Sequence, residues 1–369
     1  MDGAHSVRLV QDIGHWSTGW GRPHAQGVAG GQRRSGLVIG GGAALGGAWA
    51  VGALCALAEV EGYDPARSAD LLVGTSAGAV LAAMLACGVP LDVMRERLSG
   101  PGADDVHGTE PVNPFAVPDH VPDHVPDHVH AALGSIPRPS LLPGNLALAT
   151  RTLAAPHRYT MMTMAAGLAP RGRGSLHPVT ELIAEAAGER RWPTRPRTWI
   201  VAMDFDSGRR VTFGRGDAQV VPLPEAVTAS CAAPGYFPPV VIGGRRFVDG
   251  GAVSVTNLDV VLHEHLDDVL VLAPMATFEP DSPSGLGARL ERRARRLWTR
   301  RLNLEIARVA ATGTTVRVFA PGAQDLTVMG GNVMNPARRR EVFDTATRTV
   351  KALLTAQAEP PSTDAAGWS

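Results

Sequence analysis

Twice near its start the chain runs through a short apolar segment, a glycine-rich turn and a stretch of small apolar residues. Residues 37–39 lead into the glycines at 40–42 and a helical pattern over 46–60. Residues 71–73 lead into Gly74 and a second helical pattern over 77–87. A helix that follows a strand this closely returns the chain to the next strand in the same direction. The pattern therefore predicts an α/β fold, with a parallel sheet and helices on its faces.

Later apolar runs extend this sheet and its helical cover. They predict strands over 199–203, 210–213, 269–273 and 316–319, and a hairpin of 240–242 with 246–248. Helical patterns cover 223–232, 286–311 and 336–354. We expect one domain over 35–356, between disordered tails at 1–34 and 357–369.

A Pro/Gly-rich segment at about 100–175 interrupts the pattern, and we interpret it as an insertion over the core. The tetrapeptide VPDH occurs three times in tandem over 117–128 and spaces three histidines by four residues: His120, His124 and His128. Because each repeat carries a proline, no continuous helix can place the three on one face. The repeat therefore does not predict a metal site.

Charge and composition exclude several classes of protein. The 35 basic residues balance 35 acidic ones, so no net field favours a nucleic-acid partner. The sequence shows no uninterrupted apolar run of the length of a membrane span and no apolar core of a signal peptide. Its three cysteines form no CxxC pair, so they predict neither a zinc site nor a disulfide framework. We expect a cytoplasmic protein without a metal.

The second glycine turn holds a serine in the pattern Gly-x-Ser-x-Gly, with Ser76 between Gly74 and Gly78. On a sharp turn from strand to helix, such a serine exposes its hydroxyl oxygen, and large neighbours would clash. The helix that begins at Ala77 points its amides toward developing negative charge. A helix start made of small residues has the same pattern, so the motif alone leaves both interpretations open.

The first glycine turn, over 40–46, can present backbone amides to an anion. One interpretation is a nucleotide-phosphate loop, but the turn lacks the Gly-Lys-Ser/Thr ending of a P-loop. The other is an oxyanion hole with the amides of Gly41, Gly42 and Ala43 as donors, which suits a serine enzyme.

A third element is Asp249, which ends the predicted hairpin and precedes Gly250 and Gly251. A strand-ending Asp-Gly-Gly is also a common turn. The functional interpretation makes Asp249 the base that takes the proton from Ser76.

In this order the three elements resemble the patatin-like phospholipase family, whose members carry a glycine-rich loop, then Gly-x-Ser-x-Gly, then Asp-Gly-Gly or Asp-Gly-Ala. The flanks, GGGAALGGAWAVGALCAL over 40–57 and ASCAAPGYFPPVVIGGRRFVDGG over 229–251, are similar too. The resemblance covers about 35–100 and 196–320. It implies a three-layer α/β/α sandwich with a mostly parallel central sheet. It also implies a hydrolase of lipid carboxylic esters that works through a Ser76–Asp249 dyad, with neither histidine base nor cofactor.

Two positions depart from the family pattern. Leu45 stands where many members carry Arg or Lys, and Ala43 occupies the place of a further glycine. Neither change removes a backbone donor, but a positive charge that could assist an oxyanion or a phosphate headgroup is missing.

Two alternatives stay open. An α/β-hydrolase with a Ser-Asp-His triad could use His263 or His265, although a surface segment with solvated histidines is the plainer interpretation. A non-catalytic lipid-binding or scaffold protein could have the same fold.

Two further features lie late in the chain. The helix over 286–311 carries arginines that we expect on one face, where they could contact an anionic membrane and make the protein peripheral to it: Arg289, Arg292, Arg293, Arg296 and Arg300. A solvated arginine face is the alternative. Asn257 follows the aspartate turn and is expected to cap the next helix.

Overall fold

The computed structural model describes residues 33–99, 143–189, 192–216, 221–279, 283 and 285–358. Nearly all of both expected tails, the first half of the expected insertion and the VPDH repeat with its histidines lie outside these residues. Predictions about those segments therefore stay predictions.

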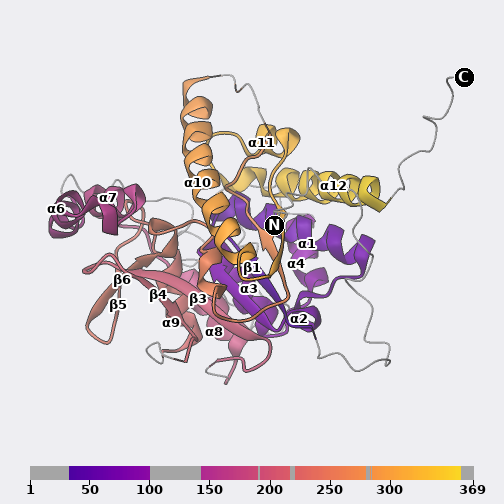
Figure 1. The fold of residues 1–369 in the computed structure, drawn as a ribbon, viewed down its shortest axis with the longest axis horizontal. Coiled ribbons are helices and arrows are strands. Elements are labelled where there is room, and N and C mark those ends of the chain that lie inside the picture. Colours follow the sequence, from indigo (N-terminus) through magenta and orange to yellow (C-terminus); the bar gives the residue numbers. More distant parts are fainter. Residues whose placement is uncertain are drawn as a thin grey trace, which may run out of the picture.

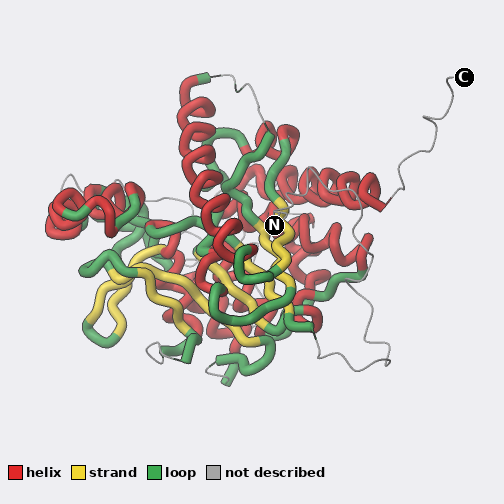
Figure 2. Tube along the Cα trace, in the orientation of Figure 1, coloured by secondary structure: helices red, strands yellow, loops and turns green. Residues whose placement is uncertain are grey.

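An eight-stranded sheet occupies the centre of the molecule (Figures 1 and 2). Its path is β5-β6-β3-β2-β1-β7-β8, and β4 pairs with β3. The strands are β1 (Ser35–Ile39), β2 (Leu71–Thr75), β3 (Arg197–Asp204), β4 (Arg210–Phe213), β5 (Val240–Ile242), β6 (Arg245–Asp249), β7 (Asp268–Leu272) and β8 (Thr315–Phe319). Five neighbours, β3-β2-β1-β7-β8, run parallel, whereas β4 and β6 run antiparallel to β3. The mostly parallel sheet is confirmed.

Alternate side chains of each strand serve opposite faces of the sheet, as the period of two requires. Leu37 and Ile39 point into one apolar cluster, and Val38 between them points into another. The first cluster lies beneath α1 (Ala43–Glu61), α3 (Ala77–Ala86), α9 (Leu223–Cys231) and α12 (Arg339–Ala358). The second lies beneath α10 (Leu286–Ala310) and the 3-10 turn η3 (Leu258–Val261). Helix, sheet and helix therefore form a three-layer α/β/α sandwich.

Among the described helices, α1 is the one with the length and apolar composition to cross a bilayer. Its residues from Leu45 to Leu57 are buried without interruption between the sheet, α3 and α12. Figure 1 shows α12 lying alongside α1. The apolar composition of α1 therefore has a full explanation in its place at the centre of a core.

The described half of the expected insertion contains helices that the sequence analysis did not predict. They are α6 (Leu146–Ala154), the turn η1 (Pro156–Arg158) and α7 (Met161–Leu168). The Thr163 hydroxyl donates a 3.0 Å hydrogen bond to the Ala252 carbonyl and so fixes α7 beside the aspartate turn. Four further helices and two turns were also not predicted as such: α2 (Pro65–Ser68), α4 (Leu91–Ser99), α8 (His177–Ala187), α11 (Ala323–Met329), η2 (Gly250–Ala252) and η4 (Pro336–Arg338).

Candidate active site

Ser76 is the single residue between β2 and α3, and its backbone has a conformation that non-glycine residues rarely adopt. Its φ is 56° and its ψ is −124°. The amide of Ser76 donates a 2.8 Å hydrogen bond to the Ser230 hydroxyl, which in turn donates to the Val201 carbonyl at 2.6 Å. Positive φ costs free energy that the surrounding contacts must offset. This is the geometry of a nucleophile elbow.

The two glycines of the elbow are required by close backbone contacts. A Cβ on Gly78 would lie 2.1 Å from the Ile39 carbonyl oxygen, which ends the neighbouring strand. A Cβ on Gly74 would lie 2.5 Å from the Cα of Ala79. Both contacts are with backbone, which cannot rotate away as a side chain can. The crowding expected from the motif is therefore present, and strand β1 is one of its sources.

Strand β3 brings the serine and the aspartate together. Thr75, the last residue of β2, pairs with Val201, and Asp249, the last residue of β6, pairs with the next residue, Ala202. β2 and β6 run in opposite directions, and their last residues therefore lie beside adjacent residues of β3. Ser76 and Asp249 meet there although they lie 173 positions apart in the chain.

Asp249 is buried, with 6 % of its surface exposed. Burial raises the pKa of its carboxyl to about 6. Hydrogen bonds from the Ser76 side chain and the Gly251 amide lower this pKa, but their effect is smaller than that of burial. The Gly251 bond is 2.7 Å long. A carboxyl with this pKa is ionised at neutral pH and still binds a proton far more readily than an exposed aspartate. It can therefore accept the proton of the hydroxyl that contacts it.

The first glycine turn lies directly against Ser76. A Cβ on Gly41 would lie 3.1 Å from the Cβ of Ser76. The Gly41 amide donates a 2.9 Å hydrogen bond to the Val255 carbonyl. Within the described residues, the amides of Gly42 and Ala43 in the glycine turn are not engaged by a backbone carbonyl, in contrast to the Gly41 amide.

The departures from the family pattern have different structural settings. Leu45 is fully buried, and its amide donates to the Val333 carbonyl at 3.1 Å. Its side chain is therefore part of the core and lies away from solvent. Ala43 begins α1 with a φ of 53°, a conformation that favours glycine. The loop thus holds an alanine in a strained position beside the serine.

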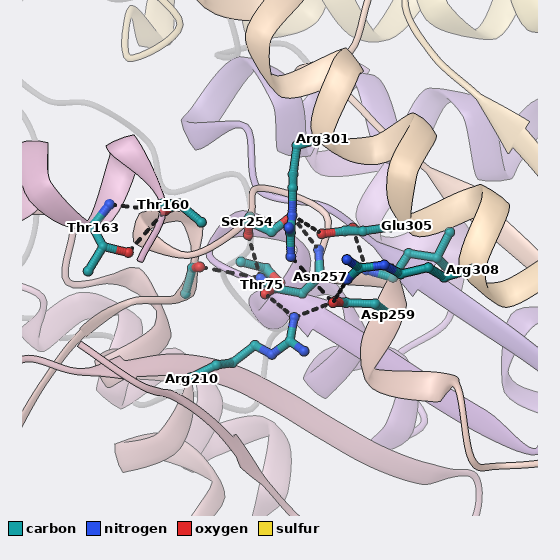
Figure 3. A network of polar contacts seen from close by, with 12 residues as sticks. Thr75, Thr160, Thr163, Arg210, Ser254, Asn257, Asp259, Arg301, Glu305 and Arg308 are labelled. Carbon is teal, nitrogen blue, oxygen red and sulfur yellow. Dashed lines mark hydrogen bonds and ion pairs between the residues drawn. The ribbon is translucent and has the colours of Figure 1, made fainter. Parts of the chain in front are cut away.

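Asn257 joins the two halves of the site, a role that the sequence analysis missed (Figure 3). Its side-chain amide donates to the Thr75 hydroxyl at 3.1 Å and to the Gly250 carbonyl at 3.3 Å, and also to the Ser254 carbonyl. Thr75 precedes the serine and Gly250 follows the aspartate, so one buried amide holds both turns. Asn257 does precede a helical turn, but its side chain makes no capping bond.

A network of charged side chains reaches Asn257 through Arg210. Arg210 donates to the side-chain Oδ1 of Asn257 at 3.2 Å and pairs with Asp259. Arg301 pairs with Asp259 at 3.4 Å and with Glu305 at 2.9 Å. Figure 3 shows this network reaching from β4 across the loop after Asp249 to α10. The network fixes Asn257, whose φ of 54° lies in the left-handed region that asparagine tolerates better than most residues.

The alternative of a Ser-Asp-His triad fails on position. His263 and His265 are exposed and precede β7, whereas Ser76 follows β2, a strand parallel to β7 through β1. The histidines therefore lie near the N-terminal ends of the parallel strands, whereas Ser76 lies at their C-terminal ends. No triad with either histidine forms.

The prediction of a shared exposed face on α10 is wrong for Arg292. This side chain is buried and donates to the Leu326 carbonyl at 2.9 Å. Arg289, Arg293, Arg296 and Arg300 are exposed. The face toward solvent is therefore narrower than the helical spacing of arginines suggested.

Among solved structures, VipD from Legionella pneumophila is similar with 14 % identity and a TM-score of 0.40, over 88 % of this chain and 67 % of that one. The type III effector protein ExoU is similar with 17 % identity and a TM-score of 0.32, over 88 % of this chain and 53 % of that one. This chain thus spans about half the length of ExoU. A search of the curated proteins found no match.

The model of one protein family, Patatin-like phospholipase, matches residues 37–262. This match spans more than half of the chain and includes the glycine loop, the serine elbow and the aspartate turn. The chain therefore belongs to the patatin-like phospholipase family.

Proposed function

We propose that the protein is a serine acyl hydrolase that cleaves carboxylic ester bonds of lipids. Ser76 is the nucleophile, Asp249 is the base, and the amides of Gly42 and Ala43 form the oxyanion hole. Support comes above all from the buried Asp249 carboxyl, whose pKa is raised to about 6 while the Ser76 side chain hydrogen-bonds to it. Membership of the family supports the lipid ester as the substrate class.

In the first half-reaction the Ser76 hydroxyl oxygen attacks the ester carbonyl carbon, and its proton passes to Asp249. The carbonyl oxygen becomes an oxyanion and accepts hydrogen bonds from the Gly42 and Ala43 amides. The bond to the alcohol then breaks, and Asp249 returns the proton to the departing alcohol oxygen. The acyl group remains on Ser76 as an ester.

In the second half-reaction Asp249 takes a proton from water as the water oxygen attacks this acyl-enzyme ester. The bond between the acyl carbon and Ser76 breaks, and the proton returns to the serine oxygen. A fatty acid leaves. Asn257 contributes by holding Thr75 and Gly250, and with them the two reacting side chains, at a fixed separation. The exposed arginines of α10 would contact the anionic surface in which such a substrate resides.

Labelling with a fluorophosphonate probe tests the proposal, because the probe reacts with activated serines. Wild-type protein should be labelled, Ser76→Ala should not, and Asp249→Asn should be labelled at least 100-fold more slowly, at about the scale expected for loss of a general base. Ser99→Ala, at the end of α4, is the matched control and should be labelled like wild type. Folded wild type that takes no label and hydrolyses no ester would favour a lipid-binding protein on this fold.

A further inference from the structure

The outermost line of α10 is apolar, which is unusual for a helix whose outward face is otherwise basic. Leu290, Leu297 and Leu304 are 70 %, 56 % and 56 % exposed. They follow one another at intervals of seven residues. At about 100° per residue they fall within about 40° of one another, opposite the buried Thr299 and Ile306. The line is about 21 Å long at 1.5 Å per residue.

Arginines border this line on one side. By the same helical geometry, four exposed arginines occupy the next arc of about 60°: Arg289, Arg293, Arg296 and Arg300. A further exposed arginine, Arg308, lies in line with the leucines and pairs with Asp259 at 3.9 Å. Both acidic residues of α10 are engaged inside the protein, Glu291 with Arg292 and Arg295, and Glu305 with Arg301. The exposed strip of leucines and arginines is therefore apolar and positively charged, and we call it the α10 strip.

A second copy of the chain is a poor partner for the α10 strip. Leucines every seven residues could occupy one core position of a coiled coil. The second core position would then hold Arg293 and Arg300 in one register, or Ala294 and Arg301 in the other, so both registers place arginine in the seam. Pairing two such helices would bring like charges together in the seam. An anionic lipid surface meets both halves of the strip, because acyl chains receive leucine side chains while phosphate groups pair with arginines.

The strip is firmly connected to the candidate active site. Arg295, on the buried side of α10, donates a 2.6 Å hydrogen bond to the Pro274 carbonyl. The Pro274 ring packs against the glycine loop, since a Cβ on Gly42 would lie 3.1 Å from its Cγ. In Figure 1 the N-terminal end of α10 projects beyond the sheet.

We propose that α10 docks on anionic membranes by inserting Leu290, Leu297 and Leu304 among the acyl chains, with the neighbouring arginines on the phosphates. This inference adds to the lipid substrate proposed above and rests on it. It goes beyond electrostatic contact, because insertion of leucines should hold the protein on the membrane when salt screens the arginines.

The test is co-sedimentation with vesicles of equal parts phosphatidylglycerol and phosphatidylcholine, in a Ser76→Ala background so that the lipid is not consumed. The triple variant Leu290→Gln, Leu297→Gln, Leu304→Gln should bind at least tenfold more weakly at both low and high salt. Arg293→Gln with Arg300→Gln should weaken binding about 25-fold at low salt, at roughly fivefold per arginine, and little at high salt. Gln keeps the helix propensity, and unchanged circular dichroism and Tm confirm folding.

Leu153→Gln, an exposed leucine of α6, is the matched control and should bind like its parent. Three results would overturn the inference: no vesicle binding by the parent, equal loss in the control, or a dimeric parent that the leucine variant turns into monomers. Hydrolysis of a soluble short-chain ester, measured with Ser76 restored, should be unchanged in every α10 variant. Loss of the proposed function would appear instead as no ester turnover in wild type while vesicle binding persists.

Discussion

Two aspartates end neighbouring antiparallel strands of the sheet, and their surroundings give them opposite affinities for a proton. Asp204 ends β3 and Asp249 ends β6, and both side chains are largely buried. Burial raises the pKa of Asp204 too, but hydrogen bonds from Ser207 and Arg245 outweigh it, and the pKa lies below its usual value. At Asp249 burial prevails, and the pKa rises to about 6.

The partners of each carboxyl explain the difference. The Asp204 carboxylate accepts bonds from the Ser207 amide at 2.7 Å, the Ser207 hydroxyl at 2.8 Å and the Arg245 guanidinium at 2.7 Å. Asp249 has hydrogen bonds from the Ser76 side chain and the Gly251 amide. A saturated carboxylate beside a cation stabilises a turn, whereas a carboxylate with few partners remains able to take a proton. Burial alone therefore does not identify a base.

Replacing each aspartate by asparagine should separate these roles most strongly at Asp249. Asp249→Asn should lower kcat/KM for ester hydrolysis by about 10³-fold or more, because the base is lost. The same variant should be more stable at pH 8. A carboxyl whose pKa is raised on folding stabilises the protein least above that pKa, and removing its charge should recover up to about 3 kcal/mol. Esterase assays and urea unfolding at pH 8 measure both, and a less stable variant would contradict the dry environment of Asp249.

A smaller effect should follow from moving the Asp249 turn without changing its chemistry. In Gly250→Ala the new Cβ would lie 2.4 Å from the Val201 carbonyl oxygen, so the turn must shift. A displacement near 1 Å at a reacting group costs about 100-fold in kcat. Gly216→Ala is the control, since a Cβ there has no neighbour within 4 Å. Equal activities of the two variants would show that the turn tolerates displacement.

The loss of esterase activity at acid pH should follow the protonation of Asp249 and not that of Asp204. Esterase kcat/KM should fall about tenfold per pH unit below about 6, because only the ionised carboxyl accepts the serine proton. In Asp204→Asn this fall in kcat/KM should begin at the same pH as in wild type. A fall that begins at a different pH in Asp204→Asn would mean that the two carboxyls titrate as one system.

Asp204→Asn itself should have the smallest effect on catalysis, less than about threefold in kcat, because the residue does not touch the reacting groups. It should lower the free energy of unfolding at pH 7 by about 2 kcal/mol, through the lost bonds to Arg245 and Ser207. A lowered pKa stabilises the protein above the unfolded value of the group, and this contribution is lost as pH falls through the folded value. Urea unfolding of the variant and wild type should therefore converge in acid.

Local patterns predicted much of this molecule because they act within a few residues. The strands, the serine elbow and the aspartate turn lie where apolar runs and glycines placed them. Gly74 and Gly78 needed no knowledge of the fold, although the backbone of Ile39 against Gly78 becomes visible only in three dimensions.

The remaining features depend on contacts between distant segments. Asn257 reaches Thr75 across 182 residues, and Ser230 reaches Ser76 across 154, so neither has a local signal beyond a small polar residue near a turn. Arg292 shows the same limit on α10. Helical spacing grouped it with exposed arginines, but the Leu326 carbonyl that binds it comes from α11.

The register of the central strand has a consequence for the order in which the protein assembles during synthesis. β1 finds its first neighbour soon after it is made, in β2, but its second neighbour is β7, and Arg33 beside β1 bonds to Asp268 across 235 residues. Such distant pairing forms late, because the intervening chain must be present before the contact offsets the entropy of closure. A nascent chain therefore carries Ser76 long before Asp249, whose strand β6 must pair with β3 before the two meet. Under the proposed mechanism, a chain that ends before Asp249 holds a nucleophile without its base and hydrolyses no ester.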